Sequence, residues 1–161
     1  MTISRQLGRY LDQQGIEYRL LPHAHSHCSK ETASLANIPE EQLAKSVLLE
    51  DKRGYLIAVI PASNRLALRE LADQLNRELE LATEAELGQV FSGCEIGAVP
   101  AVGEAFGIPT IFDESLLDEP EVYLESGDHE ELVHMNAREF GRLFAATSHG
   151  RFSHRDPYPQ H

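Results

Sequence analysis

Two apolar, β-rich segments joined by a short polar turn constrain the fold of this chain more than any other feature. The segments are Ser46 to Glu50 and Tyr55 to Ile60, and Asp51-Lys52-Arg53-Gly54 connects them. Such runs, separated by a few polar residues that end in glycine, are typical of a β-hairpin. The sequence therefore predicts a pair of antiparallel strands in its first half.

Short helical and strand patterns surround this hairpin. Apolar spacings of three and four predict helices, and Thr83 with Glu86 and Asn136 with Glu139 are capping patterns. We expect helices at residues 3–14, 29–36, 39–44, 68–79, one or two turns from 83, and 136–144. We expect further strands at 16–21, 110–112, 122–124 and 132–135. Short elements of both kinds without a clean alternation favour the α/β class, with a mixed β-sheet surrounded by short helices.

The length of the chain fits a single domain. Its 161 residues are enough for one hydrophobic core and too few for two comfortable ones. We assign residues 1–146 to this domain. Residues 147–161 are polar and end with closely spaced prolines, so we expect them to form a disordered tail.

Composition favours a cytoplasmic protein. No segment approaches the run of about 18 apolar residues that a membrane span needs. The N-terminus lacks the apolar stretch of about 7–15 residues that marks a secretory signal. The two cysteines, Cys28 and Cys94, form no disulfide framework, which fits a reducing compartment. We therefore expect no membrane partner.

Charge is distributed unevenly along the chain. The formal net charge of −12 argues against wrapping a long nucleic-acid duplex, so we expect no DNA partner. Residues 78–137 hold 15 of the 26 acidic residues and no Lys or Arg, so all 14 basic residues lie in 1–77 or 138–161. A polyanion should approach the N-terminal half and contact a small patch. A simple soluble acidic surface explains the same charge equally well.

Lys45 is the first candidate functional residue. It lies within Leu43-Ala44-Lys45-Ser46-Val47-Leu48-Leu49, where a predicted helix passes into an apolar strand. Burying an ammonium group is costly unless an anion meets it, which suggests a ligand. Alternatively, the side chain packs its stem on apolar surface and keeps its charge in water.

A glycine-bounded loop is the second candidate. It runs Gly97-Ala98-Val99-Pro100-Ala101-Val102-Gly103. Glycine lets backbone amides approach a ligand, and such amides can stabilise a developing oxyanion. A turn between strands with no other role is the alternative. The loop is not a Walker phosphate loop, because the closing Lys-Ser/Thr is absent.

Three other patterns are weaker. His23, His25 and His27 alternate and could ligate a transition metal, although no second ligand motif accompanies them. Ser126-Gly127-Asp128-His129 contains the residue types of a hydrolytic triad, but sequence neighbours rarely form one, and a Gly-Asp turn explains it better. Cys94 has no adjacent cation to activate it as a nucleophile.

Four stretches together resemble the YbaK/ProX family, the free-standing relatives of the editing domain of bacterial prolyl-tRNA synthetases. They are Leu43-Ala44-Lys45-Ser46-Val47-Leu48, Val59-Ile60-Pro61-Ala62, the loop from Gly97 to Gly103, and Leu124-Glu125-Ser126-Gly127. The resemblance extends from about Tyr18 to Leu143. It implies a mixed α/β sheet fold and metal-independent hydrolysis, in trans and without a cofactor, of mischarged aminoacyl-tRNA.

The resemblance also implies roles for individual residues. Lys45 would bind the 3′-terminal adenosine or its phosphate, and Gly97 would hold the aminoacyl carbonyl. Water or a ribose hydroxyl of the tRNA would act in place of a protein nucleophile. The remaining substrate-binding residues would be Ser46, Ala98, Val99, Pro100, Ala101, Val102, Gly103, Ser126, Gly127, His129 and His25. The partners would be the aminoacylated 3′ end of tRNA and, as a further candidate, an aminoacyl-tRNA synthetase.

Two residues depart from the family's loop pattern. Ala101 stands where the family has proline, and Val102 replaces a larger apolar residue, both near the implied amino-acid pocket. Two alternative functions stay open at this point. One is a catalytically silent module that binds a nucleotide or an aminoacyl group, and the other is a metal-dependent hydrolase that uses His23, His25 and His27.

Overall fold

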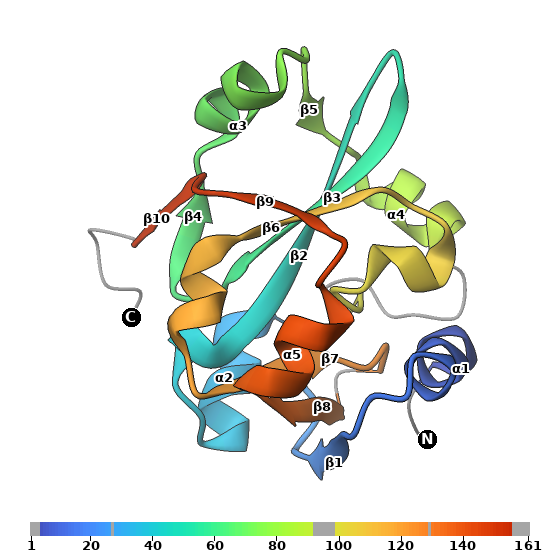
Figure 1. Cartoon of the computed structure of the whole chain (residues 1–161), viewed down its shortest axis with the longest axis vertical. Coiled ribbons are helices and arrows are strands. Elements are labelled where there is room, and N and C mark those ends of the chain that lie inside the picture. Colours follow the sequence, from blue (N-terminus) through green and yellow to red (C-terminus); the bar gives the residue numbers. More distant parts are fainter. Residues whose placement is uncertain (1–3, 27, 92–98, 129, 156–161) are drawn as a thin grey trace.

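A central mixed sheet organises the molecule (Figure 1). The computed structural model describes residues 4–26, 28–91, 99–128 and 130–155. In this part of the chain the sheet order is β1-β8-β7-β2-β3-β6-β9, and β5 also pairs with β2. The strands are β1 (Arg19–Pro22), β2 (Leu43–Asp51), β3 (Gly54–Pro61), β5 (Glu80–Leu81), β6 (Thr110–Asp113), β7 (Glu121–Glu125), β8 (Glu131–Asn136) and β9 (Ser148–Gly150). A separate two-stranded sheet pairs β4 (Asn64–Leu66) with β10 (Ser153–Arg155).

The predicted hairpin is confirmed and forms the centre of the sheet. β2 and β3 pair antiparallel from Ala44 opposite Pro61 to Asp51 opposite Gly54. Gly54 has φ +121°, a value that side chains disfavour, so glycine suits the turn. The side chains of β3 alternate between two hydrophobic clusters on opposite faces, which explains why this strand is apolar throughout.

Short helices cover the sheet. They are α1 (Arg5–Gln13), α2 (Ser29–Ala36), α3 (Leu68–Leu75), α4 (Glu84–Val90) and α5 (Ala137–Leu143). Three 3₁₀ turns are η1 (Glu40–Gln42), η2 (Gly103–Phe106) and η3 (Glu114–Asp118). The Thr83–Glu86 capping box is present, and the Asn136 side chain accepts a hydrogen bond from the Glu139 amide at 2.9 Å. No helix among the described residues is long and apolar enough to cross a membrane.

The helix expected at 39–44 is wrong. Residues 40–42 form only the turn η1, and β2 begins at Leu43. Leu43 and Ala44 are buried and pair parallel with Tyr123 and Leu124 of β7. The ladder and this burial outweigh the local preference for a helix, and they place Lys45 inside a strand.

The expectation of a disordered tail is also wrong for residues 147–155. β9 pairs parallel with β6, and β10 pairs antiparallel with β4. Phe152, between them, is fully buried, and its amide donates a hydrogen bond to the Asp113 carboxylate at 3.0 Å. One apolar side chain and one distant carboxylate order a segment whose polar composition suggests disorder. Residues 156–161 lie outside the described residues.

Asp113 stabilises this segment from inside the fold. The carboxylate accepts hydrogen bonds from the Phe152 amide, the Ser153 hydroxyl, and the amide and hydroxyl of Ser115. Burial acts to raise the pKa of Asp113, but these hydrogen bonds outweigh it and hold the pKa below its usual value. The carboxylate therefore stabilises the fold above pH 3.8, the ordinary pKa, and this contribution is lost as the pH falls through the lowered value.

We predict that Asp113→Ala lowers the free energy of unfolding by about 3 kcal/mol, because it leaves buried donors without their charged acceptor. Denaturant unfolding at pH 7 measures the loss. The difference in the free energy of unfolding between Asp113→Ala and wild type should become smaller in acid. Asp118→Ala, at an exposed position of η3, is the matched control and should change stability by less than about 0.5 kcal/mol. Equal stability of Asp113→Ala and wild type would contradict the role assigned to this carboxylate.

Candidate functional site

The edge of β2 that faces away from β3 is paired in two pieces. Among the described residues, β7 pairs with it at Leu43 and Ala44, and β5 pairs with it at Leu49 and Glu50. The Ala62 amide bonds the Leu43 carbonyl on the β3 side, whereas the Ala82 amide bonds the Leu48 carbonyl on the other side. Along such a strand, the backbone N–H and C=O of successive residues point alternately to one neighbouring strand and to the other. Ser46 is two residues before Leu48 and points the same way, so its backbone N–H and C=O face the gap between β7 and β5.

A cavity of about 190 Å³ lies at this gap. The described residues that line it come from six separate segments: Ser29, Lys45, Ser46, Val47, Leu48, Leu81, Ala82, Leu87, Val99 and Glu125. Because side chains alternate along a strand, Lys45 and Ser46 point to opposite faces of β2. Both can border one cavity because the cavity opens at the interrupted edge. The lining combines an apolar wall with a few polar groups, as binding sites for small molecules usually do.

Lys45 is the cation of this cavity. It is partly buried, and burial lowers the pKa of its ammonium group. The positive charge of Lys30 lowers the pKa further, Cys28 opposes this effect, and Arg65 adds a smaller lowering. Lys30 of α2 and Arg65 of β4 therefore both disfavour the positive charge of Lys45. An anion next to Lys45 would favour that charge.

Glu125 is the acid of the cavity, and sequence reasoning did not single it out. It is the last residue of β7 and only 1% exposed. Burial raises its pKa to about 7, and the charge of Asp128 adds to this effect, whereas the nearby Thr32 hydroxyl acts against it. The signal in the sequence was a charged residue that directly follows an apolar strand, but its burial depends on α2 and β2, which lie far away in the chain.

Ser46 contacts Val99 of the glycine-bounded loop. The Ser46 hydroxyl donates a hydrogen bond to the Val99 carbonyl at 2.9 Å, and both residues border the cavity. Gly97, which was expected to hold the aminoacyl carbonyl, and Ala98, which was expected to bind the substrate, lie outside the described residues. Pro100, Ala101 and Val102 are buried and are not among the described residues that line the cavity. Ala101 and Val102 belong to the main hydrophobic core.

Gly103 is a packing residue. A Cβ atom at this position would overlap the Thr110 hydroxyl and lie 2.7 Å from the Ile108 carbonyl oxygen. The loop therefore leaves the cavity at Val99 and is fixed against β6 at its second glycine. This glycine allows close packing rather than contact with a substrate.

The Ser126-Gly127-Asp128 segment is a turn between β7 and β8. Ser126 is fully buried, and its hydroxyl lies within hydrogen-bond distance of the Glu131 carbonyl and the Asp128 carboxylate. That carboxylate accepts from the amides of Glu130 and Glu131, and Gly127 has φ +117°. These contacts are those of a Gly-Asp turn. His129, assigned to substrate binding, lies outside the described residues.

The histidine-rich loop does not bring three ligands together in the part of the chain described. No group of three His, Cys, Asp or Glu side chains there could hold a metal ion, and His27 lies outside that part. The Nδ1 of His23 lies 2.7 Å from the Ala24 carbonyl oxygen. His25 is exposed and is not among the described residues that line the cavity. Cys28 is exposed and forms no disulfide.

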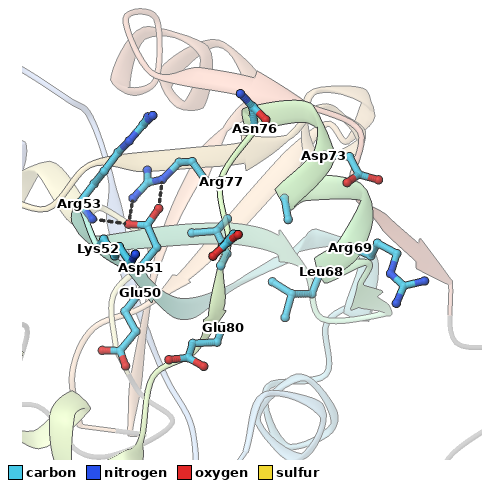
Figure 2. Close-up of a pocket in the computed structure, with 13 residues that line it drawn as sticks. Glu50, Asp51, Lys52, Arg53, Leu68, Arg69, Asp73, Asn76, Arg77 and Glu80 are labelled. Atoms are coloured by element: carbon cyan, nitrogen blue, oxygen red, sulfur yellow. Dashed lines mark hydrogen bonds and ion pairs between the residues drawn. The ribbon is translucent and has the colours of Figure 1, made fainter.

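A larger and more open hollow of about 1190 Å³ lies between the hairpin tip and α3 (Figure 2). Its charged lining includes both signs, and its central feature is an ion pair. Asp51 accepts two hydrogen bonds from the Arg77 guanidinium, each 2.6 Å long, and a third from the Arg53 amide. The Arg77 hydrogen bonds lower the pKa of Asp51 to about 2. This pair joins the hairpin tip to the segment after α3, so we assign it a structural role.

The chain belongs to the family of aminoacyl-tRNA editing domains. Residues 23–143, most of the chain, match the family model described as an aminoacyl-tRNA editing domain. This match includes β2 with Lys45, β7 with Glu125 and the glycine-bounded loop. The family membership predicted from the four sequence stretches is therefore confirmed.

Solved structures share the fold. The hypothetical protein APE2540 has a TM-score of 0.81 at 23% identity, over 93% of this chain and 100% of that chain. A candidate trans-editing enzyme for prolyl-tRNA synthetase has a TM-score of 0.77 at 25% identity, over 93% of this chain and 96% of that chain. A candidate signal transduction protein from Marinobacter aquaeolei VT8 has a TM-score of 0.76 at 22% identity, over 94% of this chain and 31% of that chain. No curated protein sequence matches this chain. The predicted mixed-sheet fold is confirmed.

We predict that Gly103→Ala destabilises the fold by about 1–3 kcal/mol, because the added methyl group must displace backbone and a buried side chain. Gly88→Ala is the matched control. It lies in α4 with open space at the Cβ position, so it should leave stability unchanged or raise it by about 0.5–1 kcal/mol. Denaturant unfolding compares the two. If Gly103→Ala were as stable as wild type, the packing role of this glycine would be refuted.

Proposed function

We propose that this chain hydrolyses the ester bond of mischarged aminoacyl-tRNA, with the reaction placed at the cavity beside Ser46. One observation carries the proposal beyond the family match. Among the described residues, the outer edge of β2 has a gap in its pairing between β7 and β5, and the cavity lined by Lys45 and Ser46 lies at this gap. Fixed main-chain groups and a cation are what an ester with a nearby phosphate needs.

The basic residues would bind the phosphate side of the substrate. Lys45 borders the cavity, and Lys30 and Arg65 act on its charge. A phosphate at the 3′ end of tRNA would neutralise this group and offset the desolvation of Lys45. Residues 78–137 supply little attraction for RNA, because they carry no Lys or Arg. We infer a small contact confined to the end of the acceptor strand.

Backbone amides would stabilise the transition state. The ester carbonyl gains negative charge as water or a ribose hydroxyl attacks it, and preorganised N–H groups stabilise that charge best. The amide of Ser46 faces the gap, and the amides of the loop at Gly97 are the family's candidates for the same role. This chemistry uses no protein nucleophile and no metal, and the attacking group comes from water or the substrate.

The size and wall of the cavity suit an aminoacyl group. Its volume of about 190 Å³ lies below the range of about 300–1,000 Å³ that is usual for larger organic ligands. The wall of Leu48, Leu81, Leu87 and Val99 is apolar, so we propose amino acids with small or medium uncharged side chains. The nucleoside would lie outside. A synthetase that delivers the tRNA is a further proposed partner.

We predict that Lys45→Met lowers kcat/KM for deacylation by about 100-fold or more, since a buried charged contact to phosphate is lost. Methionine keeps the length and apolar character of the stem, so the thermal midpoint should not fall. Release of free amino acid from a panel of mischarged tRNAs measures the reaction, and it also distinguishes an enzyme from a silent binding module.

Lys52→Met, at the exposed hairpin tip, is the matched control and should keep wild-type kcat/KM. Lys45→Arg keeps the charge and should retain part of the binding, although the longer planar group would misplace the ester. Near-normal turnover of Lys45→Met would show that the site lies elsewhere.

We predict that extensive dialysis against a chelator leaves the deacylation rate unchanged, because amides, a cation and a substrate hydroxyl suffice for the proposed chemistry. The measurement is the initial rate before and after dialysis, with metal content determined in parallel. A loss of rate that zinc restores would instead support the metal-dependent alternative at His23, His25 and His27.

A further inference from the structure

The pairing between β5 and β2 stops just before it reaches Ser46. β5 runs antiparallel to β2 with Leu81 opposite Leu49, and the Ala82 amide donates a hydrogen bond to the Leu48 carbonyl. Continuing this register by two residues would place a further residue of the same strand opposite Ser46, where it would exchange two hydrogen bonds with the N–H and C=O that face the gap. In the described part of the chain, no strand residue pairs with Ser46 on this edge.

The chain leaves β5 because a capping box starts α4 (Figure 1). The Thr83 hydroxyl accepts a hydrogen bond from the Glu86 amide at 3.2 Å, and the Thr83 amide donates one to the Glu86 carboxylate at 3.0 Å. The Tyr55 hydroxyl of β3 also donates to that carboxylate, at 3.0 Å, so the start of α4 is tied to the hairpin. The turn of the chain at Thr83 is therefore fixed, and the ladder position opposite Ser46 is open to a ligand.

An aminoacyl group has the donor and the acceptor that this ladder position needs. It is a single amino-acid residue, with an α-ammonium group and an ester carbonyl on the two sides of one Cα atom. In an antiparallel hydrogen-bonded pair, each residue uses both its N–H and its C=O on the residue opposite. The ammonium would donate to the Ser46 carbonyl, and the ester carbonyl would accept from the Ser46 amide.

The direction of β5 determines how such a group would lie. A residue that continues β5 has its amino end toward Ala82 and its carbonyl end toward the start of β2, because the two strands are antiparallel. The ester oxygen would then lie on the side of Lys45, which is where the proposed function places the phosphate. The ladder and the cation therefore require the same orientation of the substrate.

The same pairing determines where the amino-acid side chain lies. Side chains directly opposite each other in an antiparallel pair share one face of the sheet. On the face of the Ser46 side chain lies Val99, whose carbonyl accepts a hydrogen bond from the Ser46 hydroxyl at 2.9 Å. Leu48, two residues along β2, shares this face, and with Leu87 and Val99 it lines the cavity. An L-aminoacyl side chain would contact this apolar wall, whereas a D residue that kept both hydrogen bonds would point away from it.

We infer that the aminoacyl moiety binds as a one-residue continuation of β5, hydrogen-bonded to both main-chain groups of Ser46. This inference rests on the proposed deacylase function and specifies how its substrate is held. It requires a hydrogen-bond donor at the α position and the L configuration. The backbone of the aminoacyl group is read by the backbone of β2, and only its side chain is read by the wall of the cavity.

The first test varies the α substituent. Wild-type rates are measured on one tRNA that carries an alanyl, a lactyl or a propionyl group, which present an ammonium, a hydroxyl and no donor. Each rate is divided by the uncatalysed hydrolysis rate of the same ester, because the substituent itself changes the lability of the bond. The normalised rates should fall in that order, with alanyl ahead of propionyl by about 10- to 100-fold, the range expected for a hydrogen bond from a charged group.

Two results of this test would overturn the inference. One is equal normalised rates on alanyl- and propionyl-tRNA. The other is a lactyl ester that reacts no better than the propionyl ester, because a main-chain carbonyl accepts a hydrogen bond from a hydroxyl group as well as from an ammonium group.

The second test varies the configuration. L-alanyl and D-alanyl esters of the same tRNA contain the same bonds, so their rates compare directly after the same normalisation. Wild type should prefer the L ester by about 10-fold or more, and the preference should be larger for valyl esters, because a larger side chain loses more contact with the wall. Equal rates on the two configurations would overturn the inference.

The third test changes the wall. Leu87→Phe narrows the cavity on the face predicted for the side chain, so it should lower the ratio of the L-valyl to the L-alanyl rate by about 10-fold. If this variant does not fold, Leu87→Ala should raise the same ratio. Leu117→Phe, at an exposed position of η3 and not among the described residues that line the cavity, is the matched control and should keep the wild-type ratio. A ratio that no Leu87 variant changes would refute the predicted side-chain position.

The outcomes also separate this inference from the proposed function. If wild type hydrolyses alanyl, lactyl and propionyl esters equally well after normalisation, the deacylase function stands and the pairing with Ser46 is wrong. If wild type hydrolyses no aminoacyl ester, the proposed function itself fails.

Discussion

The pairing of β2 on both of its edges is the constraint on which the rest of this structure depends. On one edge β3 pairs continuously from Ala44 to Asp51, and the apolar side chains of the hairpin contribute to hydrophobic clusters on both faces of the sheet. On the other edge two different strands each cover part of β2, and they run in opposite directions relative to it. A strand cannot be parallel to one neighbour and antiparallel to the next along a single edge without a break between them. The cavity lies at that break.

The sequence predicted what depends on neighbouring residues. The hairpin, the Thr83–Glu86 capping box and the Asn136 cap were all visible because turn and cap chemistry is local. Lys45 stood out because a lone cation in an apolar strand is unusual. Pairing that joins distant segments was not visible. The parallel contact with β7 turned Leu43 and Ala44 from expected helix into strand, and the Asp113–Phe152 hydrogen bond ordered a segment expected to be disordered.

Glu125 shows the same limit within the site. In the sequence it is an acidic residue at the end of a short strand, where charged residues commonly meet solvent. Its burial arises only when α2 brings Thr32 to it and β2 brings Lys45 beside it. Two residues of the loop from Gly97 to Gly103 have different roles, and each role depends on a contact with a distant segment of the chain. Val99 reaches the cavity through the Ser46 hydrogen bond, whereas Gly103 is needed for packing against Thr110.

The construction of the cavity has a consequence for how such domains diverge. Its wall is assembled from side chains of α2, β2, β5, α4, the loop at Val99 and β7, and no single element supplies it. The groups proposed to act on the ester belong to the backbone of β2, whose position is set by ladder bonds rather than by side-chain identity. Substitutions such as Leu87 to a larger or smaller residue can therefore reshape the cavity without moving the ester. Under the proposed function, the preference for the amino acid can therefore change between relatives while the reaction is kept.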